Sequence, residues 1–176
     1  KPPLWLWGLR AGCLLAVEAA SQLREASNFL FWQPPAAGKP LLQQFMRLKL
    51  AGDMLGGQAK GVMESLRQQL ADGLPVEIAG YMLAPSLATG LELATLAPPA
   101  NAAPAQRLEW FELSTLQDAG LSPVSASTLA QWQQAGMDAR SHLVRGPAFW
   151  QTTEIEEAPA LIAATVAALS SSNGVA

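Results

Sequence analysis

The sequence is poor in the side chains that enzymes use most often for chemistry. Its 176 residues include one cysteine, Cys13, one histidine, His142, and one tyrosine. A single cysteine excludes an internal disulfide framework and is typical of a reducing compartment. The common nucleotide-binding motifs, G-x-G-x-x-G and the P-loop, are both missing. No group of His, Cys or carboxylate residues has the spacing of a metal site. We therefore expect neither a metal nor another cofactor.

Charge and long apolar runs are scarce as well. Only 14% of the residues are charged and the net charge is −3, which gives no electrostatic case for nucleic acid or an anionic membrane as a partner. No stretch approaches the ~18 uninterrupted apolar residues of a membrane span. Arg10 and Glu18 interrupt the first apolar run, so it does not form a signal peptide. We expect a cytoplasmic protein. Because the chain begins with Lys1 directly before a strand pattern, we also expect upstream sequence to be missing.

Apolar residues make up half of the chain, enough for the core of one domain over residues 1–176. Strand patterns alternate with helix patterns, an order that predicts an α/β fold: a mostly parallel, doubly wound sheet with helices on both faces. The expected strands are 4–7, 28–33, 108–113 and 139–145, with a short edge strand in 76–83. The expected helices are 11–24, 40–71 (divided or bent at its glycines), 85–96, 123–135 and 159–169. Ser122 and Gly136 are the expected cap and stop of the fourth.

The first strand runs into the sequence Gly8-Leu9-Arg10-Ala11-Gly12, which has the layout of the nucleophile elbow of α/β-hydrolases, G-x-S-x-G. In that turn the glycines let strand and helix pack closely, and the central side chain stands at the tip. Here the tip residue is Arg10, which stays protonated and offers only hydrogen-bond donors, so it cannot attack an acyl group. Either Arg10 holds a carboxylate or phosphate of a ligand, or it pairs with an acid such as Glu112 or Asp118 and fixes the turn.

The other members of a catalytic triad are incomplete too. In α/β-hydrolases the acid and then the histidine follow the nucleophile along the chain. Glu112 and Asp118 fall where the acid is expected, but without a histidine partner in the loop we favour reading them as solvated or salt-bridged carboxylates. His142 lies inside the last expected strand, and the loop over 146–151 has no imidazole. His142 is thus either a hydrogen-bonded packing residue or an unorthodox base. Cys13 is either a buried small residue or a second candidate nucleophile.

Two further segments suggest a place for a ligand. Phe149 and Trp150 follow the last strand, at the edge where open α/β sheets bind ligands, and they either line a pocket for an acyl or isoprenoid chain or only pack. Residues 40–96 stand where hydrolases insert a cap. The methionines and leucines of this segment cover an apolar pocket, meet a partner surface or form a core.

Several long runs of the sequence resemble one family, the exosortase A system-associated hydrolase 2 proteins. The runs are LWLWGLRAGCLLA, FLFWQPPAAGKPLLQQFMRLKLAGDML, VEIAGYMLAPSLA and GPAFWQTTEIEEAPALIAAT, which together span essentially the whole chain. The resemblance implies an α/β-hydrolase-like fold encoded beside bacterial exosortase and exopolysaccharide genes. Family members carry an N-terminal segment with the early strands, an HPF-type motif and a G-C-G-D-S-x-G turn, none of which is present here. By this resemblance the chain is the C-terminal two-thirds of the fold, and Arg at the elbow is a family tendency.

We consequently expect a hydrolase of the exosortase system that acts on an ester or thioester without a recognisable triad. The alternative is a catalytically inactive binding or assembly protein on the same scaffold, and a third reading is a small-molecule anion binder built around Arg10. The expected partners are an acyl or lipid-like ligand, a second copy of the chain or another exosortase-system protein. The candidate catalytic residues are Arg10, His142 and Glu112, and the candidate substrate-binding residues are Gly8, Gly12, Phe149 and Trp150.

Overall fold

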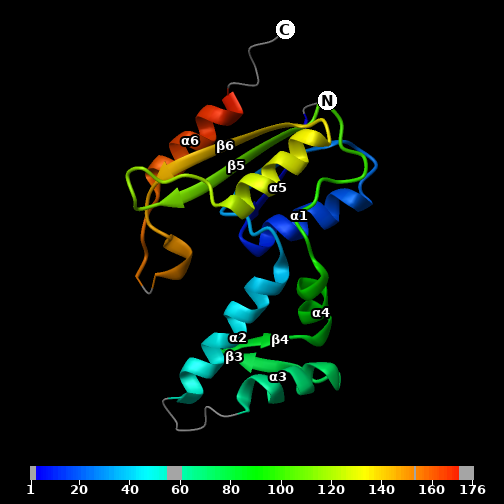
Figure 1. Cartoon of the computed structure of the whole chain (residues 1–176), viewed down its shortest axis with the longest axis vertical. Helices are drawn as coiled ribbons and strands as arrows, with labels where there is room; N and C mark the ends of the chain where they lie inside the picture. The colour runs from blue at the N-terminus through cyan, green and yellow to red at the C-terminus, as the bar shows by residue number, and fades with distance from the viewer. Residues whose placement is uncertain (1–2, 55–60, 153, 171–176) are drawn as a thin grey trace. The chain divides into compact units, whose positions relative to one another are not determined.

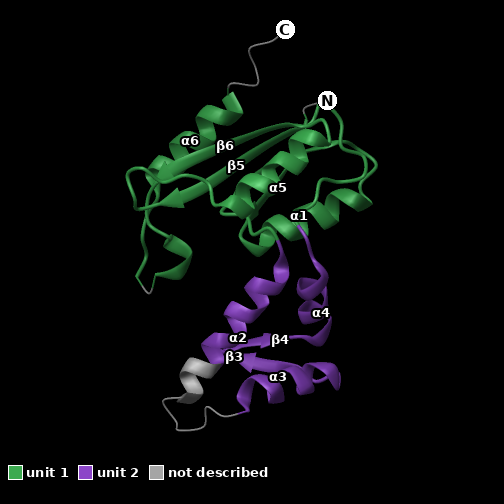
Figure 2. Cartoon of the chain, in the orientation of Figure 1, with its two compact units in different colours: residues 1–36, 96–176 green, residues 37–95 purple. Residues whose placement is uncertain are grey.

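The structure, a computed structural model, describes residues 3–54, 61–152 and 154–170. The chain divides into two compact units, drawn in different colours in Figure 2. The first consists of residues 1–36 and 96–176, and the second of residues 37–95. The sequence predicts one domain with a cap-like segment over 40–96. In the structure, residues 37–95 have a hydrophobic core of their own.

The first unit is built on a four-stranded parallel sheet (Figure 1). Its strands are β1 (Leu4–Leu9), β2 (Ser27–Trp32), β5 (Arg107–Ser114) and β6 (Asp138–Arg145), arranged in the order β1-β2-β5-β6. The expected α/β class and parallel sheet are therefore confirmed. Residues of β2 are buried almost throughout, as a strand between two neighbours and two helical layers requires.

Helices cover both faces of this sheet. Trp132 of α5 (Pro123–Gln134) contacts Phe29 and Phe31 edge-on, with ring centroids 5.1 and 5.8 Å apart. Leu161 of α6 (Pro159–Ser170) packs instead with Leu30. Because successive strand residues point to opposite faces, α5 and α6 lie on opposite sides of the sheet. The first helix, α1 (Ala11–Gln22), shares the α5 side, since it packs over Gly8, whose neighbour in register is Phe31.

Local chemistry sets the ends of α5 as the sequence predicts. The Ser122 hydroxyl accepts a hydrogen bond from the backbone N–H of Ser125 at 3.1 Å, which satisfies one of the free N–H groups of the first turn. Gly136 follows the helix with a φ of 92°, a conformation that glycine adopts without a steric penalty.

The second unit contains α2 (Gly38–Met54), α3 (Val62–Ala71), the strands β3 (Val76–Ile78) and β4 (Tyr81–Leu83), and α4 (Pro85–Leu93). The expected helical tract over 40–71 is thus two helices, and the glycines at 56 and 57 lie outside the described residues. The buried core of the second unit consists of Leu42, Met46, Leu66, Val76, Ile78, Leu83 and Ala88.

The segment 76–83, expected as one edge strand, is an antiparallel hairpin of two short strands. Ala79 and Gly80 connect them, with φ angles of 50° and 81°. Positive φ at both central residues is the signature of a type I′ turn, whose twist matches the twist of paired strands. An alanine at the first position conceals this turn, because alanine is not among the residues that favour it.

The two ends of the second unit meet. Ala37 and Thr95 form an isolated antiparallel bridge, and the backbone N–H of Gly38 donates to the carbonyl of Ala94 at 2.9 Å. A Cβ atom on Gly38 would collide with the carbonyl oxygen of Leu91, so the start of α2 and the end of α4 pack backbone to backbone. Residues 37–95 therefore leave and rejoin the rest of the chain at neighbouring points.

Candidate ligand-binding site

Arg10 connects β1 to α1 through a sharp turn. Its backbone has φ 54° and ψ −122°, a combination that few residues other than glycine adopt. Two hydrogen bonds hold this conformation: the Arg10 N–H donates to the Trp32 carbonyl at 2.9 Å, and the Cys13 N–H donates to the Arg10 carbonyl at 3.0 Å. A residue kept in a sparsely populated conformation costs on the order of 1–3 kcal/mol, and such residues cluster at functional sites.

The two glycines beside Arg10 differ in their surroundings. A Cβ atom on Gly8 would lie 2.5 Å from the backbone nitrogen of Cys13, so a glycine is needed for α1 to pack over the strand. A Cβ on Gly12 would meet nothing within 4 Å. The expectation that both glycines permit the close packing is therefore wrong for Gly12, because its α-carbon faces open space.

The side chain of Arg10 lies against the segment that follows the last strand. Its guanidinium carbon is 5.8 Å from the ring centroid of Trp150, within the range of a cation–π contact. Trp150 belongs to the short 3-10 helix η1 (Phe149–Gln151). Burial lowers the pKa of the Arg10 guanidinium, yet arginine stays charged in proteins. The structure thus brings three of the expected residues, Arg10, Phe149 and Trp150, into one cluster.

Aromatic rings extend this cluster along the carboxyl ends of β1 and β2. Phe149 contacts Trp150 at a centroid distance of 5.2 Å and Trp32 at 6.3 Å, and Trp32 contacts Trp7 at 4.8 Å. The indole N–H of Trp32 donates to the Thr165 hydroxyl at 3.0 Å. The indole nitrogen of Trp150 is buried and has no hydrogen-bond partner among the described residues, which is an unusual state for a buried donor.

His142 is engaged elsewhere. Its Nε2 lies 2.6 Å from Oε2 of Glu109, which is fully buried, and its ring stacks on Phe111 at 4.4 Å. The other oxygen of Glu109 accepts a hydrogen bond from the guanidinium of Arg107, which also donates to the Ala168 carbonyl at 3.2 Å. Arg107, Glu109 and His142 therefore form a charged network between the sheet and α6.

This arrangement separates the three expected catalytic residues. Phe111 pairs with His142 in the register of β5 and β6, so Glu112 points to the opposite face of the sheet from His142. The carboxylate of Glu112 accepts a hydrogen bond from the indole N–H of Trp110 at 2.9 Å. Three strand spacings of about 4.8 Å separate β1 from β6, or about 14 Å between His142 and the Arg10 strand. No triad-like geometry links Arg10, Glu112 and His142 in the described part of the chain.

Arg107 and Glu109 were not among the residues expected to be functional, although the sequence pattern around them indicates a buried charged pair. Arg107 and Glu109 are two residues apart within a strand, so their side chains share a face, and Glu109 stands in an otherwise apolar run. A carboxylate inside a buried strand needs a charged or donating partner. His142, at a similar depth of the neighbouring strand, was the obvious candidate.

Cys13 is fully buried beneath the turn, and its thiol donates to the Gly8 carbonyl at 3.2 Å. Burial raises the pKa of this thiol far above its usual range. A thiol that does not ionise is a poor nucleophile, so the packing role is the one its surroundings support.

Within residues 3–54, 61–152 and 154–170, no three His, Cys, Asp or Glu side chains converge in a way that would hold a metal ion. In the same ranges no helix has both the length and the apolar character needed to cross a bilayer.

The different surroundings of Gly8 and Gly12 predict opposite effects of an alanine at the two positions. Gly8→Ala should lower the free energy of unfolding by about 3 kcal/mol or more, because the new methyl group overlaps the backbone of α1. Gly12→Ala should raise it by about 0.5 kcal/mol, because alanine favours a helix and the space is open. Urea unfolding of both variants measures the difference, and equal effects would contradict the packing described.

The buried network predicts a large cost for neutralising Glu109. Glu109→Gln keeps the shape but removes the nearer of the two carboxylates beside Arg107, whose side chain is 14% exposed, and leaves only the Asp138 carboxylate at 3.9 Å. The free energy of unfolding should therefore fall by about 3 kcal/mol. The matched control is Glu156→Gln, an exposed carboxylate, with an expected change below about 0.5 kcal/mol. A loss of similar size in both variants in chemical unfolding would argue against the network.

Cys13 predicts a dependence of stability on alkaline pH. Its thiol ionises in the unfolded chain at about pH 8.5, whereas burial raises the pKa of Cys13 in the folded chain. Below pH 8.5 the Cys13 thiol is protonated in both the folded and the unfolded state. Above pH 8.5 it loses its proton only in the unfolded state, which lowers the free energy of unfolding by about 1.4 kcal/mol per pH unit. The free energy of unfolding, followed from pH 8 upwards, should fall with this slope, and Cys13→Ala should remove that part of the slope.

No protein-family model matches this chain, and no curated protein matches it either. The relation to the exosortase-associated hydrolases therefore stays a resemblance carried by the sequence runs quoted above.

Proposed function

We propose that this chain is an α/β-hydrolase-type domain that binds an anionic acyl ligand at the turn after β1 and does not hydrolyse it. The observation that carries this proposal is the position of Arg10. A charged side chain stands at the tip of a strained turn (φ 54°) that in hydrolases presents the nucleophile. Because strain of this kind persists where the tip residue has a task, Arg10 is the functional group of the site.

The arrangement of the helices supports a hydrolase-type scaffold. The sheet order β1-β2-β5-β6 is parallel, with α1 and α5 on one face and α6 on the other, and residues 37–95 are inserted between β2 and β5 at the place of a hydrolase cap. Together with the sequence resemblance, this supports a role in a bacterial exosortase or exopolysaccharide system. The one thiol, buried and unpaired with another cysteine, supports the cytoplasm as its compartment.

The chemistry of the site indicates the class of ligand. A guanidinium offers donors in a planar fork that fits a carboxylate or a phosphate. Phe149 and Trp150 supply apolar surface beside it, suited to an acyl chain, and an acceptor atom on a bound ligand would also satisfy the indole N–H of Trp150. No group with nucleophilic character accompanies Arg10, since the Cys13 thiol is buried and its pKa is raised.

The second candidate is an ester or thioester hydrolase, which one observation favours. The Glu109–His142 pair, 2.6 Å apart, has the chemistry of the acid and imidazole in a triad. Its position disfavours that role, because His142 lies inside β6 with its ring stacked on Phe111 and not in the loop that follows this strand. We therefore interpret the pair as part of the packing beneath α6.

Binding of octyl phosphate tests the proposal directly, with octanol as a probe of the same chain length without charge. Titration of the chain should shift its indole fluorescence, because Trp150 lies beside Arg10. Arg10→Gln should weaken octyl phosphate binding about tenfold or more through the loss of a charge-assisted contact, and leave octanol binding unchanged. Arg24→Gln, an exposed arginine in the same unit, is the matched control with no expected change.

Two results would overturn the proposal. Equal affinity of octyl phosphate for the wild-type chain and for Arg10→Gln would remove Arg10 from the site. Hydrolysis of p-nitrophenyl esters or acyl thioesters by the chain, abolished in His142→Ala, would replace binding by catalysis and establish the second candidate.

A further inference from the structure

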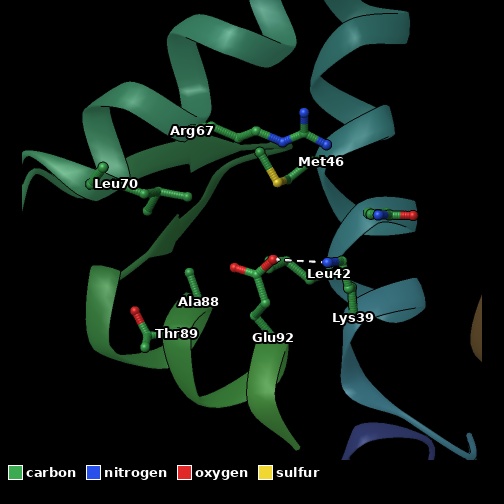
Figure 3. Close-up of a pocket in the computed structure, with 10 residues that line it drawn as sticks. Lys39, Leu42, Met46, Arg67, Leu70, Ala88, Thr89 and Glu92 are labelled. Atoms are coloured by element: carbon green, nitrogen blue, oxygen red, sulfur yellow. Dashed lines mark ion pairs between the residues drawn. The ribbon is translucent and has the colours of Figure 1, made fainter.

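A pocket lies entirely within residues 37–95. It is an open pocket of about 530 Å³ lined by residues of α2, α3 and α4 (Figure 3). This volume is in the range of pockets that hold small organic ligands. The pocket has no part in the site around Arg10, which is formed by the other unit of the chain.

The floor of the pocket is apolar. Leu42 and Met46 of α2 and Ala88 of α4 line it, with exposed fractions of 7%, 2% and 5%, and Leu70 of α3 completes it. Leu42 and Met46 are four residues apart, so they lie on one face of α2. These side chains come from the core of the unit, which makes the pocket an opening onto the core.

Charged side chains surround the mouth. Lys39 of α2 and Glu92 of α4 form an ion pair at 3.4 Å, drawn as a dashed line in Figure 3. Arg67 extends from α3 toward α2 in the same view. Arg67 forms an ion pair with Glu64 at 3.9 Å on the same helix, and because both side chains are more than half exposed this pair contributes little to stability. The lining residues carry a net charge of +1, from two cations and Glu92.

The charge pattern selects among the possible head groups. Glu92 balances Lys39, and Arg67 is left as the cation facing an incoming ligand. A carboxylate adds one negative charge and fits the guanidinium fork. A doubly charged phosphate would exceed the net charge of +1 of the lining, and a cationic head group would meet repulsion from both Lys39 and Arg67.

We propose that this pocket binds a fatty carboxylate, with its alkyl chain on Leu42, Met46 and Leu70 and its carboxylate on Arg67. The site is separate from the one at Arg10 and does not depend on it. It assigns a ligand of its own to the inserted unit, which would then bind lipid-like molecules and not serve only as a cover.

Three probes with the same alkyl chain test the head group: dodecanoate, dodecanol and dodecyltrimethylammonium. Calorimetric titration of the full chain should show the tightest binding for dodecanoate. Arg67→Gln should weaken dodecanoate binding about tenfold without affecting dodecanol. Arg47→Gln, an exposed arginine of α2 that does not line the pocket, is the matched control and should bind as the wild type does.

A second variant and a mapping experiment locate the site. Thr89→Phe places a ring at the exposed rim of α4 and should weaken binding of dodecanoate and dodecanol alike by filling the pocket. A diazirine analogue of dodecanoate should label peptides of α2, α3 or α4. All six tryptophans lie outside residues 37–95, so labelling of peptides that contain tryptophan would place the ligand in the other unit.

The outcomes separate this proposal from the one for Arg10. Loss of dodecanoate binding in Arg10→Gln but not in Arg67→Gln would overturn the pocket proposal while supporting the site at the turn. Equal binding of dodecanoate by the wild type and Arg67→Gln, or no binding at all, would also overturn it. Loss of octyl phosphate binding in Arg10→Gln together with loss of dodecanoate binding in Arg67→Gln would support both sites.

Discussion

The absence of a side chain at Gly8 is the constraint on which the site depends. Because nothing but a hydrogen atom separates this residue from the backbone of Cys13, α1 can begin directly over the end of β1. That close approach forces the chain to reverse within one residue, and Arg10 takes the strained conformation that results. This turn also holds the guanidinium near Trp150, in the segment that follows the last strand. One missing methyl group thus determines where the principal charge of the site lies.

Charge is used in two different ways within the first unit. The Glu109 carboxylate accepts a hydrogen bond from Arg107 and contacts His142 beneath α6, where an unpaired charge would be expensive. Arg10 is only partly desolvated and contacts a ring face. A buried network of this kind fixes structure and has little to offer a ligand. The Arg10 guanidinium instead lies beside Trp150 on the turn after β1, at the strand edge where open α/β sheets bind ligands. This contrast is the physical reason for preferring Arg10 to His142 as the functional residue.

The parallel sheet could be predicted from the sequence, because its strands are apolar runs that alternate with segments of helical periodicity. The turn at Arg10 could also be predicted, because Gly8 and Arg10 follow a strand directly. Phe149 and Trp150 were expected at the carboxyl edge of the sheet because they follow the last strand directly, and in the structure they lie beside Trp32 and Arg10. The sequence did not pair His142 with Glu109, since partners across strands depend on register, which the linear pattern leaves open. Nor did it divide 76–83 into a hairpin, because Ala79 adopts a positive φ that its residue type does not announce. The pocket formed by Lys39, Arg67 and Glu92 depends on how three helices pack, and no short motif encodes it.

The bridge between Ala37 and Thr95 has a consequence for how the sheet assembles. β2 and β5 are neighbours in space although the whole of residues 37–95 lies between them in the chain. Closing a long, unstructured connection carries an entropy penalty that grows with its length. Once Ala37 and Thr95 are held together, the same connection behaves as a short tether, and the effective separation of the two strands falls sharply. The length or sequence of the inserted unit can therefore vary while β2 and β5 keep their register.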